Sequence, residues 1–227
     1  MCARKQIAVM QPYFYPYAGY FRLFAAADHF VILDTVQFPR RGRVHRCQLP
    51  DSDGENIWLT LPIEKCPVET PISGIQFHKD AATLIEHRVG RILSSFKQES
   101  GYRKVRDTLL DHLDKPVDYL SRHLRETAAY LGFGTEIIRS SELPDLRCED
   151  YQDRIIQIVK TLGGTDYVNL PGGVDLYDAE RFHREGIGLH FLTPYTGKFR
   201  YLIPALICAS AEAIRADIRE TTRFVDN

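Results

Sequence analysis

Residues 6–38, QIAVMQPYFYPYAGYFRLFAAADHFVILDTVQF, set the fold class of this chain. The run QIAVMQ (6–11) is apolar and meets a proline, which predicts a buried strand that stops there. A helix is expected over 18–28, and HFVILDTVQF (29–38) predicts a second strand. Strand, helix and strand in succession indicate a βαβ crossover and therefore a parallel pair.

The elements further along the chain extend this pattern. A β-hairpin is predicted over about 43–63, followed by a short strand over 74–78. Apolar residues at helical spacing predict helices at 80–98, 116–132, 151–164, 176–186 and 203–220. Further strands are expected at 135–140, 166–169 and 187–192.

Strands alternate with helices at both ends of the chain, and helices dominate its middle. This order predicts an α/β protein with a mostly parallel, Rossmann-like open sheet, to which a β-hairpin and a helical insertion are added. We expect one domain over 1–227, with a helical lobe at about 80–132, because no repeat or low-complexity linker divides the chain.

Composition narrows the class of protein. The 227 residues carry 29 Lys and Arg against 30 Asp and Glu, so net charge does not favour binding to nucleic acid or to a membrane. IAVM (7–10) is too short for a signal peptide, and no window has the ~20 apolar residues of a membrane span. The five cysteines are scattered without a CxxC pair, so we expect a reduced, cytoplasmic protein.

The loop QPYFYPYAGY (11–20) is the first candidate site, because open α/β sheets bind ligands beyond the carboxyl ends of their strands. A backbone that starts a helix there would suit a phosphate, and the tyrosines could stack on a ring. The residues concerned are Gln11, Tyr13, Tyr17, Gly19 and Tyr20. Alternatively, these aromatic side chains pack over the sheet and the prolines shape a rigid turn.

The second candidate is DTVQFPRRGRVHR (34–46), where Asp34 and Gln37 precede a cluster of arginines. Guanidinium groups match phosphate and carboxylate oxygens in pairs, so the cluster favours an anionic ligand. Its members considered for binding are Arg40, Arg41, Arg43, His45 and Arg46. The alternative is a solvated hairpin edge that charge protects from pairing.

Two further segments follow predicted strands. NLPGGVDLYDAERF (169–182) should face the same crevice, with Gly172 and Gly173 giving a flexible turn, and Ser140 could donate to a phosphate. The capping of a following turn or helix is the competing interpretation for such residues. The histidines show no paired metal spacing, so no metal site is predicted, and the sequence identifies no cofactor. Cys47 beside the arginines is more readily explained as a strand thiol than as a nucleophile.

Five motifs together resemble the WbqC-like family. They are MQPYFYPYAGYF (10–21), DxVQFxxRG (34–42), SS (140–141), GGxxLYD (172–178, which includes Tyr177) and FxxxGI (182–187). The resemblance implies a cytoplasmic sugar-modifying enzyme associated with bacterial surface-polysaccharide and O-antigen biosynthesis. The chain departs from the family pattern at Thr35, at Arg43, His45 and Cys47, and in its last helix. These departures bear on the identity of the substrate more than on membership of the family.

Residues and resemblance together predict a group transferase acting on an anionic, nucleotide-linked sugar or a sugar phosphate, without nucleic acid or membrane. Asp34 is expected to be the catalytic base and Gln37 to orient the substrate. Arg41 and Arg46 would bind phosphate, and the tyrosines would stack. Two alternatives stay open. One is a nucleotidylyl (adenylyl) transferase, although PYAGY lacks the histidines of such enzymes, and the other is a non-catalytic binding or scaffold protein that works with other biosynthetic enzymes.

Overall fold

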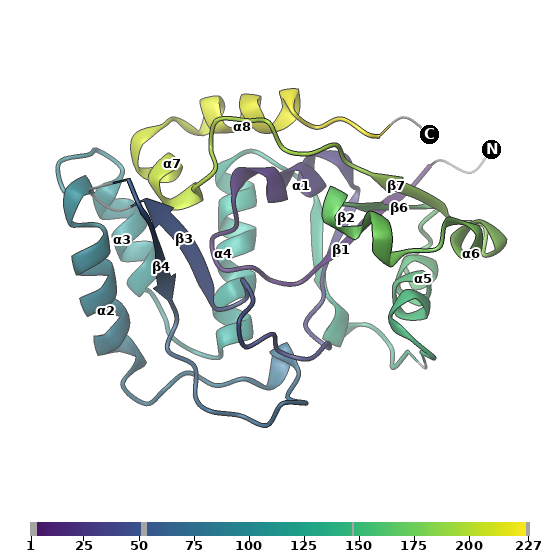
Figure 1. The fold of residues 1–227 in the computed structure, drawn as a ribbon, viewed down its shortest axis with the longest axis horizontal. Helices are drawn as coiled ribbons and strands as arrows, with labels where there is room; N and C mark the ends of the chain where they lie inside the picture. The colour runs from purple at the N-terminus through teal and green to yellow at the C-terminus, as the bar shows by residue number, and fades with distance from the viewer. Residues whose placement is uncertain (1–3, 51–53, 147, 226–227) are drawn as a thin grey trace.

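Five parallel strands form the main sheet, in the order β5-β2-β1-β6-β7. The computed structural model describes residues 4–50, 54–146 and 148–225 (Figure 1). The strands are β1 (Gln6–Met10), β2 (His29–Ile32), β5 (Glu136–Arg139), β6 (Asp166–Asn169) and β7 (Gly188–Phe191). This sheet confirms the predicted Rossmann-like α/β class. The strand order reverses between β1 and β6, where such sheets bind ligands.

Both faces of the sheet are covered, because successive side chains on a strand point to opposite sides. Ile7 and Val9 of β1 belong to the apolar cluster with α5 (Tyr151–Thr161) and α6 (Ala179–Arg184). Ala8 belongs to the larger cluster on the other face. The helices that contribute to this larger cluster include α1 (Arg22–Ala26), α4 (Pro116–Tyr130), α7 (Leu202–Cys208) and α8 (Ala211–Glu220), together with two helices of the chain's middle part.

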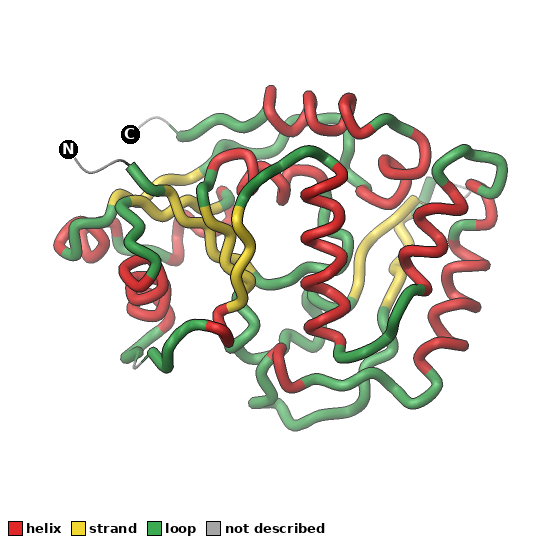
Figure 2. Tube along the Cα trace, turned by 180° about the vertical axis from the view of Figure 1, so that it is seen from behind, coloured by secondary structure: helices red, strands yellow, loops and turns green. Residues whose placement is uncertain are grey.

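The predicted hairpin is confirmed, and it forms a separate antiparallel sheet of two strands, β3 (Arg46–Pro50) and β4 (Asn56–Thr60). Cys47 and Leu59 are opposite each other and buried, whereas Trp58 is exposed. The hairpin contacts α2 (Ala81–Ile92), and α4 stands between it and the main sheet (Figures 1 and 2). Part of the predicted turn, residues 51–53, lies outside the described residues.

Helices fill the chain between the hairpin and β5. They are α2, α3 (Tyr102–Leu110) and α4, and α3 was not individually predicted. Pro116 begins α4, as expected for a residue that lacks an N–H, and Gly132 follows its end with a φ of 74°. This stretch corresponds to the predicted helical lobe. No helix of the described residues is both long and apolar enough to span a membrane.

Several predicted elements are wrong in extent, among them the helix expected over 80–98, which ends at Ile92. The strand expected over 29–38 ends at Ile32, and beyond it Gln37 makes only an isolated bridge to Pro71. The strand expected over 74–78 is reduced to a bridge between Ile63 and Phe77. The helix expected over 203–220 is two helices, because the backbone is extended at Ala209 and Ser210 before α8 begins.

Candidate functional site

A cavity of about 400 Å³ lies where the strand order reverses, beyond the carboxyl ends of β1 and β6. The first loop after β1, the loop after β6, the end of β2 and α5 line it together. Its lining residues are Val9, Met10, Gln11, Tyr13, Tyr17, Leu33, Arg43, Ile155, Asn169, Leu170, Pro171, Gly172, Gly173, Leu176 and Tyr177. We call it the switch-point cavity. Its place in the sheet and its size are those of a small-molecule site.

Three tyrosines supply most of the aromatic surface of this cavity. The rings of Tyr13 and Tyr17 come from the first loop, and that of Tyr177 from the loop after β6. Burial raises the pKa of all three phenols, so they remain protonated at neutral pH. The Tyr177 hydroxyl lies 3.2 Å from that of buried Tyr167 in β6, which orients its ring. The cavity therefore offers aromatic faces and hydroxyl donors.

Arg43 is the only charged side chain among the described residues that line the switch-point cavity. Its carbonyl oxygen accepts a hydrogen bond from the Phe14 N–H at 3.0 Å, which ties the arginine segment to the first loop. Its guanidinium lies 5.8 Å from the centre of the Trp58 ring. The described lining of the cavity thus carries one positive charge, on an exposed side chain that lies beside Trp58 of the hairpin.

The loop after β6 passes close to the strand end. The Asn169 side chain is buried, and its Oδ1 accepts from the Leu170 N–H at 2.7 Å. A Cβ atom at Gly173 would lie 2.5 Å from the Asn169 Nδ2, so any side chain here would have to displace the buried Asn169 amide. A Cβ atom at Gly172 would meet nothing within 4 Å. The two glycines therefore differ: one permits close packing and the other leaves open space.

The structure brings six of the residues predicted to bind substrate into this cavity: Gln11, Tyr13, Tyr17, Gly172, Gly173 and Tyr177. Gly19 and Tyr20 are instead buried in the 3-10 turn Ala18–Phe21, and the Tyr20 hydroxyl donates to the Gln11 carbonyl at 2.7 Å. The sequence did not point to Asn169, and it indicated Arg43 only as one of five members of the cluster after β2. The position of Asn169 at the end of a predicted strand was the available signal.

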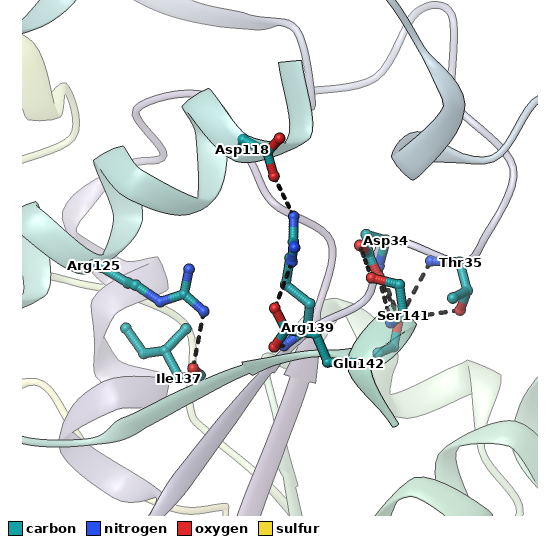
Figure 3. A network of polar contacts seen from close by, with 9 residues as sticks. Asp34, Thr35, Asp118, Arg125, Ile137, Arg139, Ser141 and Glu142 are labelled. Atoms are coloured by element: carbon teal, nitrogen blue, oxygen red, sulfur yellow. Dashed lines mark hydrogen bonds and ion pairs between the residues drawn. The ribbon is translucent and has the colours of Figure 1, made fainter. Parts of the chain in front are cut away.

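Asp34 is fully buried at the carboxyl end of β2 and faces the end of β5 (Figure 3). Its carboxylate accepts from the Ser140 Oγ at 2.8 Å, the Ser141 N–H at 2.9 Å and the Ser141 Oγ at 2.6 Å. In return, the Asp34 N–H donates to the Ser140 Oγ at 3.1 Å. We call these three residues the β2–β5 latch. It satisfies the carboxylate within the protein, as a buried charge requires.

Arg139 reinforces the same edge of the sheet. Its guanidinium pairs with Asp118 of α4 and lies 2.9 Å from the Glu142 carboxylate (Figure 3). Glu142 also accepts from the Arg139 N–H at 3.0 Å. A separate cavity of about 380 Å³ borders the latch, lined by both serines, Thr35 and the segment that follows β5. Ser140 therefore lies away from the switch-point cavity.

Four other residues predicted to belong to the site lie outside the switch-point cavity. Arg46 stacks over the Trp58 ring at 4.2 Å, and its Nε donates to the Gly42 carbonyl at 3.2 Å. Arg41 is exposed, and its carbonyl accepts from Arg46. His45 lines another cavity beside the hairpin, and Gln37 is exposed. None of these four lines the switch-point cavity.

Other chemistry is limited in the described residues. Cys47 is buried in β3, and burial raises the pKa of its thiol, as expected for a strand thiol rather than a nucleophile. No group of three or more His, Cys, Asp or Glu side chains that could hold a metal occurs in the described part of the chain. The described lining of the switch-point cavity thus consists of aliphatic side chains, three tyrosine rings, two amides, two glycines and one arginine.

Fold and site together define an α/β protein with a cavity at the switch point of a parallel sheet. The family model for the WbqC-like protein family matches residues 11–202, and the chain belongs to this family. It is also similar to the uncharacterized protein Rv1507c of Mycobacterium tuberculosis, with 26% identity over 191 residues that cover 78% of each chain. No solved structure matches the chain.

Proposed function

We propose that this protein is a cytoplasmic group transferase that acts on an anionic, nucleotide-linked sugar in bacterial surface-polysaccharide biosynthesis. The observation that supports the substrate class is the lining of the switch-point cavity, where Arg43, three tyrosines and a glycine turn surround one space at the reversal of the sheet. Membership of the WbqC-like family supports the biological setting.

Each part of a nucleotide sugar has a suitable partner in this cavity. The Arg43 guanidinium would pair with phosphate oxygens, for which its forked geometry is suited. The rings of Tyr13, Tyr17 and Tyr177 would stack on the base or on apolar faces of the sugar. The amides of Gln11 and Asn169 would hydrogen-bond to hydroxyl groups of the ligand. The open space at Gly172 would allow the ligand to approach the protein backbone closely.

Asp34 is assigned a positioning role in this proposal. Its carboxylate is fully buried, and the two serines of the β2–β5 latch hydrogen-bond to both of its oxygens. Leu33, the residue before it, lines the switch-point cavity. Asp34 would therefore act by holding the end of β2 in place, and Ser141→Ala should reproduce the loss of turnover in Asp34→Asn. If Asp34 were the base, Ser141→Ala would keep most of the turnover.

One observation favours a non-catalytic binding protein as the second candidate. No carboxylate, imidazole or thiol is present among the described residues that line the switch-point cavity, so a general base would have to come from the substrate or a partner enzyme. Adenylyl transfer gains no such support. The turn that would hold a triphosphate is buried, and its Ala18 N–H already donates to the Phe199 carbonyl at 3.2 Å.

The first experiment is a thermal-shift and calorimetric panel of UDP- and TDP-linked sugars, acyl-CoAs, nucleoside triphosphates with Mg²⁺, and inorganic phosphate. A nucleotide sugar at 100 times its Kd should stabilise the fold by about 2.7 kcal/mol. Arg43→Ala should raise the Kd by about 10- to 100-fold, because it removes charged hydrogen bonds to phosphate. Arg91→Ala, on the exposed side of α2, is the matched control and should leave the Kd unchanged.

Two outcomes would contradict parts of this proposal. Equal Kd values in Arg43→Ala and wild type would show that the ligand does not bind in the switch-point cavity. A loss of binding confined to Arg41→Ala would support Arg41 as the phosphate-binding residue, as the sequence predicts. If a nucleotide sugar binds but mass spectrometry finds no modified product with acyl, amino or glycosyl donors and the co-expressed pathway enzymes, the binding-protein alternative is correct.

A further inference from the structure

The arginine cluster after β2 is divided between two separate cavities. Arg43 faces the switch-point cavity, whereas Arg40 and His45 line a second cavity of about 600 Å³ beside the hairpin. No described residue lines both cavities. Val44, which lies between Arg43 and His45 in sequence, is fully buried. A single ligand on one site therefore does not account for the whole cluster.

The second cavity is strongly basic. Among the described residues, three cations line it, Arg40, Lys65 and Arg88, against one carboxylate, Glu64. They come from three parts of the chain: the segment after β2, the segment after β4, and the α2 helix. Like charges are gathered here without acidic partners of equal number, which is unfavourable unless solvent or an anionic ligand compensates them. We call this space the hairpin cavity.

Both arginines are held in place by backbone carbonyl groups. The Arg40 guanidinium donates to the Cys66 carbonyl at 2.7 Å, and the Arg88 guanidinium donates to the Thr60 carbonyl. Each guanidinium has five N–H donors, so most of them stay available to a ligand. Because a fixed guanidinium loses less entropy when it binds, the site is already ordered for an anion.

The imidazole of His45 adds a polar group to the same cavity. Its Nδ1 atom is buried and has no hydrogen-bond partner among the described residues. The ring packs edge-on against Phe38, with centroids 5.1 Å apart, and the His45 carbonyl accepts from the Leu61 N–H at 2.7 Å. A buried nitrogen without a partner is costly, so packing against Phe38, and not a hydrogen bond of this atom, fixes the ring at the cavity.

The other wall of the hairpin cavity is apolar, formed by Phe38, Leu61, Pro62 and Ile63. The volume exceeds what a single phosphate needs, so the ligand should have an organic part against this wall. We infer that the hairpin cavity is a second binding site, separate from the switch-point cavity, for a small organic phosphate. Its phosphate lies between Arg40, Lys65 and Arg88, and its organic part lies on the apolar wall.

Cys66 provides a direct readout of this site, because it lines the hairpin cavity and is partly exposed. The experiment measures the alkylation rate of Cys66 by peptide mass spectrometry, with pyrophosphate or phenyl phosphate as the probe and with NaCl at matched ionic strength. Cys208 is exposed and lines neither cavity, so it serves as the internal reference. At 100 times its Kd, the probe should slow Cys66 alkylation by about tenfold or more and leave Cys208 unchanged.

Arg88→Gln tests whether the protection depends on the basic lining, with Arg91→Gln on the same helix as its matched control. Arg88→Gln should raise the probe concentration needed for half-protection by at least about tenfold, and Arg91→Gln should not. Phenyl phosphate should protect at lower concentration than inorganic phosphate. Equal Cys66 rates with and without probe would overturn the inference, as would protection that Arg88→Gln leaves unchanged.

The outcome is independent of the proposed function. Binding of a nucleotide sugar that is lost in Arg43→Ala but gives no protection of Cys66 would support the switch-point cavity and reject the hairpin site. Protection of Cys66 that persists in Arg43→Ala, without any binding of nucleotide sugars, would support the hairpin site and reject the proposed function.

Discussion

Two neighbouring parts of the same sheet edge have opposite character. At the ends of β2 and β5, Asp34, Ser140 and Ser141 hydrogen-bond to one another and the carboxylate is fully buried. At the ends of β1 and β6, the side chains of Gln11, Tyr13 and Tyr177 and of the incoming Arg43 line a cavity instead.

The difference shows that a polar side chain at the carboxyl edge of a parallel sheet is not by itself a sign of ligand binding. A carboxylate whose partners are supplied by the next strand stabilises the fold, because burial without them would be costly. Rings and a guanidinium that face an open space remain available to a ligand. Hydrogen-bond satisfaction, more than position along the edge, separates the two roles.

Removing the latch should give the largest effect on stability. In Asp34→Ala the Ser140 hydroxyl and the Ser141 N–H lose their acceptor, and we expect the free energy of unfolding to fall by about 3 kcal/mol. Urea unfolding followed by circular dichroism measures this change. Thr35→Ala, which removes an exposed hydroxyl 3.0 Å from the Ser140 Oγ, is the control and should cost less than about 1 kcal/mol. A wild-type midpoint for Asp34→Ala would show that the latch does not hold the strands together.

Lowering the pH should reduce the stability of the fold through His123, a buried residue that contacts the first loop. The Tyr15 hydroxyl in the first loop lies 2.9 Å from the Nδ1 of buried His123. Burial, together with the charge of Arg122, lowers the pKa of His123 to about 3. The unfolded chain, with an imidazole pKa of about 6.5, therefore binds more protons between these values, and stability falls as the pH falls through that window.

The expected size of this effect is about 2 kcal/mol of lost stability at pH 5 relative to neutral pH. Denaturant midpoints measured at pH 7 and pH 5 for the wild type and for His123→Gln check it, and the variant should show a smaller change between the two. His45, with a pKa lowered to about 4 by burial and by Arg46, contributes in the same direction, so His45→Gln is the comparison variant. A pH dependence of equal size in wild type and His123→Gln would exclude His123 as its source.

The paired glycines of the cavity give the smallest effect and the sharpest contrast. A methyl group at Gly173 would lie 2.5 Å from the Asn169 Nδ2, so Gly173→Ala should cost about 1–2 kcal/mol. At Gly172 nothing lies within 4 Å, so Gly172→Ala should stay within about 0.5 kcal/mol of the wild type. Thermal unfolding of the two variants measures the difference. Equal loss in both would mean that the loop after β6 does not pack on Asn169 as described.

Much of this molecule follows from local pattern. The apolar runs that became β1 and β6, the glycine after α4 and the two glycines after β6 were predicted because strand length, helix ends and tight turns depend on neighbouring residues. The strand predicted through residue 38 was wrong, because the hydrogen bonds that stop β2 at Ile32 come from Ser140, more than a hundred residues away in sequence.

The arginine cluster shows the same limit for the candidate sites. In sequence, Arg40, Arg41, Arg43, His45 and Arg46 are one group, and composition alone indicated an anionic ligand. They are separated into the switch-point cavity, the hairpin cavity and a stack on Trp58, and this separation depends on partners distant in sequence, such as Arg88 and Trp58.

The chain's own residue pattern therefore established the α/β class and the segments that reach the carboxyl edge of the sheet, since periodicity and turn chemistry are local properties. Only the tertiary structure decided that Asp34 hydrogen-bonds to two serines while Arg43 lines a cavity. Burial and hydrogen-bond satisfaction are set by residues far apart in sequence, and they determine which polar groups are left for a ligand.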